Sequence, residues 1–169
     1  KYDNKKTFKT KKNFAKNCCL NLFMSFNLIF MGTPEFGREF LEYIHSNVDF
    51  NIKAVYTQAP KRSNRGQKVN LSPVHKYAKD KNLNVFFPSK FTKSEIENIK
   101  RIKPDVILVV AYGLILPEEV LMIPSCGSVN VHASLLPKWR GAAPIQRSIM
   151  NMDYESGISI MKIIRKLDS

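Results

Sequence analysis

An unbroken apolar run near the middle of the chain limits the possible folds more than any other feature. All residues from Val106 to Ala111 are apolar, and Pro104 and Gly113 lie on either side of them. A strand with one face in water alternates apolar and polar residues, whereas a run without alternation is typical of a strand buried on both faces. We therefore expect residues 105–111 to form the central strand of a sheet that is covered on both sides.

The rest of the sequence fits the same architecture. Short apolar runs alternate with amphipathic stretches, which is the pattern of a parallel α/β sheet. Two expected helices begin with a capping residue followed by proline, at Thr33-Pro34 and Ser72-Pro73. The predicted fold class is α/β: Rossmann-like, with a mostly parallel open sheet and helices on both faces. The expected strands cover residues 27–31, 51–57, 84–87, 105–111, 127–132 and 157–164, and the expected helices cover residues 34–45, 73–77, 95–101, 117–122 and 142–152.

The chain is strongly basic, with a formal net charge of +13. A charge of this size indicates a polyanionic partner, with nucleic acid the first candidate and an anionic membrane surface the second, although charge that serves only solubility is the alternative. Part of the charge lies in residues 58–70, a polar segment that we predict to be a mobile basic loop. This loop is either a solvated connection or an element that binds phosphates. Its cations are Lys61, Arg62, Arg65 and Lys68.

The first 23 residues differ from the rest of the chain. They carry seven Lys and one Asp, and Met24 follows them directly. We interpret residues 1–23 as a basic tail outside the fold: a disordered arm, an organellar targeting segment or, as the favoured reading, upstream sequence translated in frame. The domain is then expected to span residues 24–169.

Cysteine usage and hydropathy bear on the compartment. The chain has three Cys, and they form neither a disulfide framework nor a Cys-x-x-Cys metal pattern. Apolar runs are far shorter than the ~20 residues that a membrane helix needs. We therefore expect a cytoplasmic protein with no membrane association, or an organellar one if the tail is a targeting segment.

The segment that begins at Asn130 carries the clearest chemical signal. Asn130 and His132 end an expected strand, and residues two apart in a strand point to the same side. An amide donor beside a titratable ring suits reactions at a carbonyl group, although a lone histidine at a strand end is often structural. Asp168 ends a strand-like run just beyond the last expected strand, so we expect its carboxylate at the same edge of the sheet.

Other catalytic patterns have little support. The turn after the first expected strand lacks the Gly-x-Gly-x-x-Gly of dinucleotide-binding folds, and no Ser lies in a Gly-x-Ser-x-Gly elbow. His45 and His75 belong to no recognisable metal-binding motif of His and Cys residues, so we expect both on helix surfaces. No metal site is predicted.

Several motifs occur in an order that resembles one known family. They are residues 31–36 (Met-Gly-Thr-Pro-Glu-Phe), residues 109–117 (Val-Val-Ala-Tyr-Gly-Leu-Ile-Leu-Pro), Asn130-x-His132, and residues 134–146, which begin Ser-Leu-Leu-Pro-Lys-Trp-Arg-Gly. Asn-x-His with Ser-Leu-Leu-Pro is similar to the signature of folate-dependent formyltransferases. Together with the flanking motifs, the segment from Phe26 to Ser169 resembles the amino-terminal catalytic domain of the methionyl-tRNA formyltransferase family.

The resemblance implies a function and a set of site residues. The implied reaction transfers a formyl group from 10-formyltetrahydrofolate to the α-amino group of methionyl-initiator tRNA in translation initiation, with no metal and, we expect, in a monomer. The implied catalytic residues are Asn130, His132 and Asp168. The implied folate-binding residues are Tyr112, Gly113, Ser134, Leu135, Leu136 and Pro137, and the implied tRNA-binding residues are Lys61, Arg62, Arg65, Lys68 and Arg140.

The sequence also departs from the family pattern. Ile164 and Lys166 replace the usual Asp and Gly ahead of Asp168, and loss of that Gly would alter a turn that needs positive φ. The carboxy-terminal β-barrel domain of the family is missing, so we expect a C-terminally truncated domain with weakened tRNA binding. The alternatives are a formyltransferase acting on glycinamide ribonucleotide or a nucleotide sugar, a formyltetrahydrofolate hydrolase, or an inactive module that binds folate or RNA.

Overall fold

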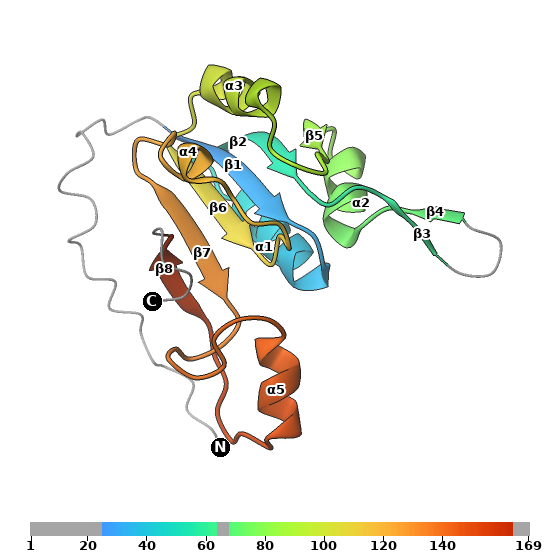
Figure 1. The fold of residues 1–169 in the computed structure, drawn as a ribbon, viewed down its shortest axis with the longest axis vertical. Coiled ribbons are helices and arrows are strands. Elements are labelled where there is room, and N and C mark those ends of the chain that lie inside the picture. Colours follow the sequence, from blue (N-terminus) through green and yellow to red (C-terminus); the bar gives the residue numbers. More distant parts are fainter. Residues whose placement is uncertain (1–24, 64–67, 164–169) are drawn as a thin grey trace.

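A single open sheet forms the centre of the molecule. The structure, a computed structural model, describes residues 25–63 and 68–163. The strands are β1 (Phe26–Gly32), β2 (Phe50–Tyr56), β3 (Lys61–Ser63), β4 (Lys68–Asn70), β5 (Val85–Phe86), β6 (Val106–Val110), β7 (Ser128–His132) and β8 (Ser159–Lys162), and the helices are α1 (Glu35–His45), α2 (Pro73–Asp80), α3 (Lys93–Ile102), α4 (Glu118–Leu121) and α5 (Pro144–Met150) (Figure 1).

The sheet is mostly parallel, as predicted. Its strand order is β5-β2-β1-β6-β7-β8. β1 pairs in parallel with β2 and β6, β6 pairs in parallel with β7, and β2 pairs in parallel with β5. The apolar run forms β6, which has strands on both sides and lies between two buried clusters. The carboxyl ends of the parallel strands therefore meet at one edge of the sheet.

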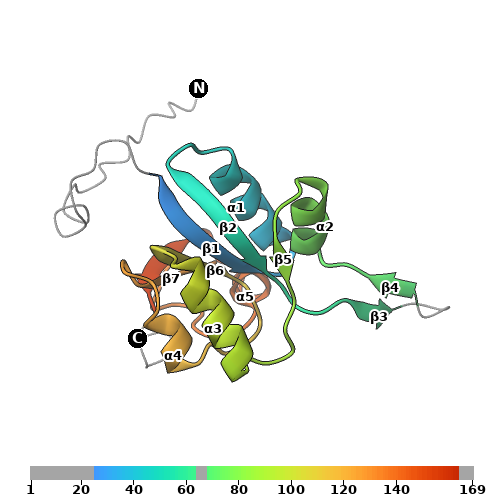
Figure 2. The same ribbon diagram turned by 90° about the horizontal axis from the view of Figure 1, so that it is seen from above.

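Helices cover both faces of the sheet, and the strand periodicity assigns residues to each face. Figure 2 shows α1 and α2 on one face and α3 and α4 on the other. Leu28 and Phe30 pack toward the α1 and α2 side with Leu41, whereas Ile29 and Met31 belong to the core under α3 and α4. Alternate residues of a strand point to opposite faces, so β1 requires both layers.

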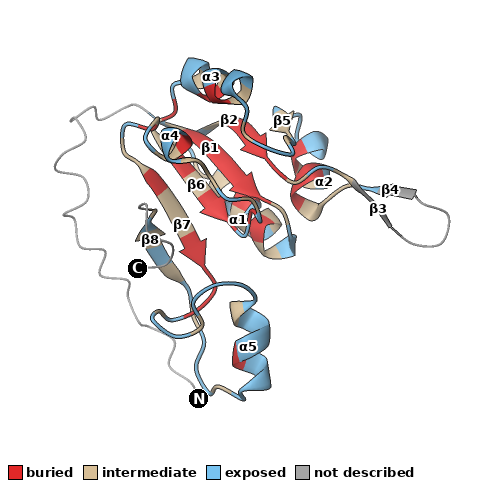
Figure 3. Ribbon diagram, in the orientation of Figure 1, coloured by how far each residue is buried: buried red, intermediate tan, exposed pale blue. Residues whose placement is uncertain are grey.

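The end of the sheet at β8 is the exception to the parallel pattern. β8 runs antiparallel to β7, with His132 opposite Ser159 and Val129 opposite Lys162. Figure 3 shows that burial falls off toward β8 and α5, while the central strands are buried. Ile160 of β8 is 72% exposed.

The two predicted helix caps have different outcomes. The Ser72 hydroxyl accepts a hydrogen bond from the His75 backbone N–H at 3.1 Å, so this cap is confirmed. The predicted Thr33 cap is wrong, because Pro34 occupies the N-cap position and α1 begins at Glu35. Thr33 instead donates from Oγ1 to the carbonyl oxygen of Tyr112 at 2.7 Å. This bond ties the turn after β1 to the segment after β6.

The segment predicted to be a mobile basic loop contains two short antiparallel strands. Lys61 in β3 lies opposite Asn70 in β4, and Ser63 lies opposite Lys68. Figures 1 and 2 show this pair projecting away from the main sheet. The sequence gives little signal for these strands, because each has three residues and little alternation of apolar and polar types. Arg65 lies outside the described residues.

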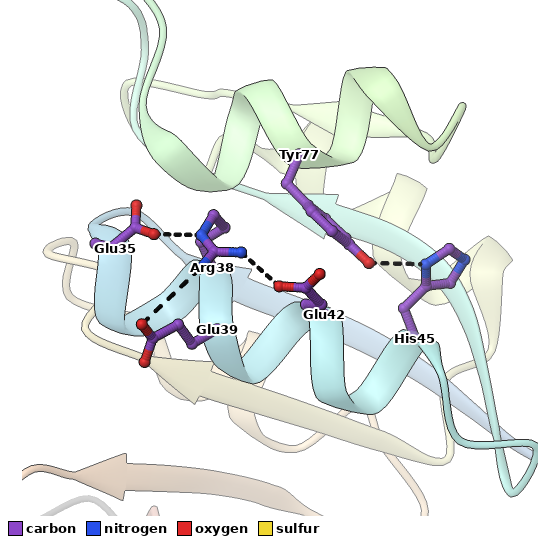
Figure 4. Close-up of polar contacts among 6 residues, drawn as sticks. All are labelled: Glu35, Arg38, Glu39, Glu42, His45 and Tyr77. Atoms are coloured by element: carbon purple, nitrogen blue, oxygen red, sulfur yellow. Dashed lines mark hydrogen bonds and ion pairs between the residues drawn. The ribbon is translucent and has the colours of Figure 1, made fainter.

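A polar network on the surface joins α1 to α2. Arg38 contacts the carboxylates of Glu35, Glu39 and Glu42 on its own helix, and the Tyr77 hydroxyl lies 3.2 Å from Nδ1 of His45 (Figure 4). The acidic neighbours raise the pKa of Arg38. Because these ion pairs are exposed, they are screened by salt and contribute little to stability.

The two helix histidines differ in burial. His45 is exposed, as predicted, but His75 is buried, which corrects the expectation of a surface position. His75 lies on the inner side of α2 and stacks on Phe87, with ring centroids 5.3 Å apart. Burial lowers the pKa of this imidazole, and Lys79 lowers it further.

Within residues 25–63 and 68–163, no helix combines the length and the apolar character needed to cross a membrane.

The predicted basic tail of residues 1–23 lies outside the described residues.

The central position of β6 leads to a stability prediction. Ile107→Val removes one buried methylene group from β6 and should lower the free energy of unfolding by about 1 kcal/mol. Ile160→Val, the same change on exposed β8, should have almost no effect. Urea unfolding of both variants tests this. Equal destabilisation would contradict the placement of β6 at the centre.

Candidate functional site

A large cavity lies at the carboxyl edge of the parallel strands, where open α/β sheets bind ligands. Its volume is about 930 Å³, near the upper end for small-molecule sites. The segments after β1 and β6, the end of β7 and the start of α5 form its walls. Apolar side chains dominate the lining, among them Phe36, Leu114, Leu116, Leu121, Ile145 and Met161.

Asn130 and His132 lie together in this cavity, as the strand spacing predicts. Their register explains the placement. Asn130 pairs with Val109, which belongs to the core under α3 and α4, whereas Val131 packs in the core on the opposite face. Asn130 and His132 thus point to the face of the sheet that carries α3 and the short helix α4, at the carboxyl ends of the strands. A few polar groups within a mostly apolar cavity are the usual composition of a ligand site.

His132 has a defined partner on one ring nitrogen. Its side chain is largely buried, and Nε2 lies 2.9 Å from the carbonyl oxygen of Trp139. A carbonyl oxygen only accepts hydrogen bonds, so Nε2 carries the proton in this arrangement. In the neutral ring the other nitrogen, Nδ1, then carries no proton and can accept one.

Asp153 organises the turn that contains Trp139. Its Oδ2 accepts a hydrogen bond from Nε1 of Trp139 at 2.6 Å, and its Oδ1 accepts bonds from Lys138 and Asn151, also at 2.6 Å. These bonds, with the one from Lys138 first, hold the pKa of the Asp153 carboxyl well below its usual range. The Asp153 side chain is only 5% exposed.

The Ser-Leu-Leu-Pro segment forms a hydrogen-bonded turn that also contacts β8. The hydroxyl of Ser134 donates to the carbonyl of Lys138 at 2.6 Å. The hydroxyl of Ser159 donates to the carbonyl of Ser134 at 2.7 Å and accepts from the N–H of Leu136 at 3.0 Å. Because Ser159 lies opposite His132 in the β7–β8 pair, this turn is fixed beside the histidine.

The residues implied to bind folate are distributed over different surfaces. Tyr112 and Gly113 line the 930 Å³ cavity, although the Tyr112 side chain is itself buried in the core. Ser134 and Leu135 line a separate cavity of about 490 Å³ beside Asp153. Leu136 and Pro137 line neither of these two cavities.

The residues implied to bind tRNA are only partly described. Arg140 is exposed in the turn that follows Trp139. The backbone of Lys61, Arg62 and Lys68 lies in β3 and β4, which follow the carboxyl end of β2. Since β2 and β7 point in the same direction, these strands leave the sheet at the edge where His132 lies.

The third implied catalytic residue, Asp168, lies outside the described residues. Its place at the His132 edge stays a prediction. β8 runs antiparallel to β7, and the N–H of Ile163 at its end donates to the carbonyl of Ser128, at the opposite end of β7 from His132.

In the part of the chain that the structure describes, no set of side chains is arranged as metal ligands. No group of three or more His, Cys, Asp and Glu residues there is arranged to hold an ion.

Gly113 provides a local test of the cavity wall. Its φ is +83°, and a Cβ there would lie 2.2 Å from Nε2 of Gln58, which donates to the Tyr112 carbonyl. Gly113→Ala should therefore displace the flexible Gln58 side chain and break its hydrogen bond, in addition to the ~1–2 kcal/mol cost of an L residue at positive φ. Gly141→Ala is the matched control, because Gly141 has φ +82° and open space around it. Equal losses for the two variants in urea unfolding would contradict a stabilising role of the Gln58 hydrogen bond.

Asp153 leads to a prediction for acid stability. Its pKa is lower in the folded than in the unfolded chain, so its contribution is fully present above the unfolded value of about 4 and is lost as the pH falls through the folded value. Below pH 4, the free energy of unfolding of the wild type should therefore fall more steeply than that of Asp153→Asn. Urea unfolding between pH 2.5 and 7 measures both slopes. Parallel curves would contradict the three-bond arrangement.

Sequence reasoning missed the role of Asp153. A single acidic residue between Met152 and Tyr154 carries no recognisable pattern. Its three partners come from two segments that only the fold brings together, so no spacing rule would have found it.

Two solved structures with the same fold are named as a transformylase and a deformylase. Glycinamide ribonucleotide transformylase 1 from Geobacillus kaustophilus superposes with a TM-score of 0.65 at 19% identity, over 87% of this chain and 78% of that one. A formyltetrahydrofolate deformylase from Pseudomonas syringae pv. tomato gives 0.61 at 17% identity, over 86% and 48%. At these identities the similarity establishes the fold.

Sequence relatives are much more similar. The methionyl-tRNA formyltransferase of Pelagibacter ubique is 51% identical over 148 residues, which are 86% of this chain and 47% of that protein. The enzyme of the same name from Dictyoglomus thermophilum is 48% identical over 145 residues, 84% of this chain and 46% of that protein. The chain thus spans about half the length of the curated relatives it matches. Residues 25–169 match the profile described as formyl transferase, so the chain belongs to the formyl transferase family.

Proposed function

We propose that the protein transfers a formyl group from 10-formyltetrahydrofolate to the α-amino group of methionyl-initiator tRNA. The observation that carries the proposal is that Asn130 and His132 line the same cavity at the carboxyl edge of the sheet. The chain is also about 50% identical to named methionyl-tRNA formyltransferases. An amide donor and a ring that exchanges protons are the two groups that acyl transfer to an amine requires.

The reaction assigns a separate task to each residue. The amine nitrogen forms a bond to the formyl carbon, and the carbonyl oxygen gains negative charge in the tetrahedral intermediate. The side-chain N–H of Asn130 stabilises this oxyanion. Nδ1 of His132 takes the proton that the amine loses, because Nε2 is protonated toward Trp139. The bond from carbon to the folate nitrogen then breaks, that nitrogen receives the proton held on Nδ1 of His132, and tetrahydrofolate leaves with the imidazole neutral again.

The donor fits the character of the cavity. The folate carries rings whose faces can pack on apolar side chains and whose edges bear hydrogen-bonding groups, and the cavity has an apolar lining with a few polar groups. We assign Tyr112, Gly113 and residues 134–137 to folate binding as part of the proposal. Asp168 is assigned a role in orienting His132 or moving the proton of the amine.

The acceptor fits the distribution of basic residues. The segment with Lys61, Arg62, Arg65 and Lys68 follows the carboxyl end of β2, at the edge of the sheet where the cavity lies. Arg140 is exposed and directly precedes Gly141, which lines the cavity. We assign these cations to the phosphates of the tRNA acceptor end, because Lys and Arg position nucleic acids through their phosphates.

A comparison of acceptors tests this function. The complete gene product is incubated with 10-formyltetrahydrofolate and, separately, with methionyl-initiator tRNA, glycinamide ribonucleotide, an amino-sugar nucleotide or water alone. We expect rapid product formation only with the charged tRNA, and binding that weakens with salt. Faster transfer to another acceptor, or hydrolysis of the donor alone, would refute the assignment.

A further inference from the structure

We infer that Asp153 is a positioning residue that acts on His132 through Trp139. The expected change in kcat rests on the proposed function. The expected tautomer of the His132 ring does not. The chain of contacts has two hydrogen bonds. Nε1 of Trp139 donates to Oδ2 of Asp153 at 2.6 Å, and the carbonyl of Trp139 lies 2.9 Å from Nε2 of His132.

The backbone of Trp139 shows why an anchor is needed. Its φ is +57°, in the left-handed region that bulky L residues rarely adopt. Such a conformation persists when the surroundings fix it. Trp139 is fixed at both ends, since Asp153 holds the indole and His132 contacts the carbonyl. Release of the indole would allow the backbone to relax and the carbonyl to move away from the imidazole.

Asp153 is suited to serve as the fixed end of this chain. Its carboxylate accepts from three donors and is nearly buried, so its position is determined by groups on both sides. It also lies at the end of α5, where its backbone N–H donates to the Ser148 carbonyl at 3.0 Å. The anchor therefore belongs to the α5 segment, while the histidine belongs to β7.

The consequence for His132 is a choice of tautomer. A fixed carbonyl at Nε2 keeps the proton there and leaves Nδ1 as the acceptor in the neutral ring. Without that carbonyl, both neutral tautomers become populated and the ring is free to rotate. Only a fraction of molecules would then present the correct nitrogen to the amine.

The test uses Trp139→Phe, which keeps an aromatic ring but removes the donor, and Asp153→Asn, which removes the carboxylate at similar volume. Asn151→Ala is the matched control, because it removes one bond to Oδ1 and leaves the Trp139 bond at Oδ2. The readouts are the ¹⁵N chemical shifts of the His132 ring in the complete gene product, and kcat and KM for formyl transfer.

We expect a single Nε2-protonated form of neutral His132 in the wild type and in Asn151→Ala. In Trp139→Phe we expect mixed tautomers and a kcat lower by about 10- to 100-fold, with KM for the folate little changed. Asp153→Asn keeps an amide oxygen that can accept from the indole, so we expect a smaller change in the same direction. An unchanged tautomer in folded Trp139→Phe would overturn the inference, whether or not Asp153→Asn folds. The chemical shifts are measured without substrate. They therefore test the role of Asp153 even if the proposed reaction is wrong.

Discussion

Replacing His132 with alanine is expected to lower kcat for formyl transfer by about 100- to 10,000-fold, the range for loss of a positioned general base. The variant lacks the nitrogen that accepts the proton of the amine, while the cavity and the sheet remain. His132→Gln separates two roles, since its amide can still donate to the Trp139 carbonyl but cannot accept a proton at neutral pH. We expect this variant to be as slow as alanine.

The matched control for this prediction is His45→Ala. His45 is exposed on α1, on the face of the sheet opposite Val109 and Asn130. Its replacement should leave kcat unchanged. Steady-state kinetics of the three variants, with a folate-binding measurement on each, provide the test. Turnover by folded His132→Ala at the rate of the wild type would remove the proposed role, and full activity of His132→Gln would reduce that role to positioning.

Replacing Asn130 with alanine is expected to lower kcat by about 100- to 1,000-fold, the effect of removing one donor from an oxyanion site. The bond to the oxygen strengthens only as negative charge develops, so KM should change little. Asn130→Asp should be at least as slow, because it replaces the donor with a carboxylate of the same size that repels the oxyanion. Steady-state kinetics with varied folate and varied tRNA measure both constants.

Asn98→Ala is the control for Asn130. Asn98 lies on α3 and donates to Glu95 at 3.5 Å, away from the cavity. It should retain the kcat and KM of the wild type. If Asn130→Ala instead raised KM with kcat unchanged, Asn130 would bind the ground state and the proposed oxyanion contact would be wrong.

Much of the fold was predictable because its strongest signals are local. The apolar run of β6 requires burial on both faces wherever it lies in the sheet, and Ser72-Pro73 caps α2 through bonds within one turn of helix. Asn130 and His132 also point to the same side of their strand as a consequence of strand geometry alone. These features depend on residues close together in the sequence.

The remaining features depend on contacts that the sequence pattern does not encode. The strand at residues 159–162 has the same composition whether it runs parallel or antiparallel, and only its pairing with β7 decides the direction. Thr33 has the residue type of a cap but bonds to Tyr112, 79 residues away. The link from Asp153 to His132 likewise requires a turn at Trp139 with positive φ, which no aromatic residue favours by itself.

We propose that the site of Asn130 and His132 performs formyl transfer to methionyl-tRNA. The most direct test is a single-turnover measurement with enzyme in excess over charged initiator tRNA and with saturating 10-formyltetrahydrofolate. We expect the wild-type complete gene product to form formyl-methionyl-tRNA, and the folded double variant Asn130→Ala/His132→Ala to bind the folate but form almost none. Product formation by the double variant at the rate of the wild type would contradict the account.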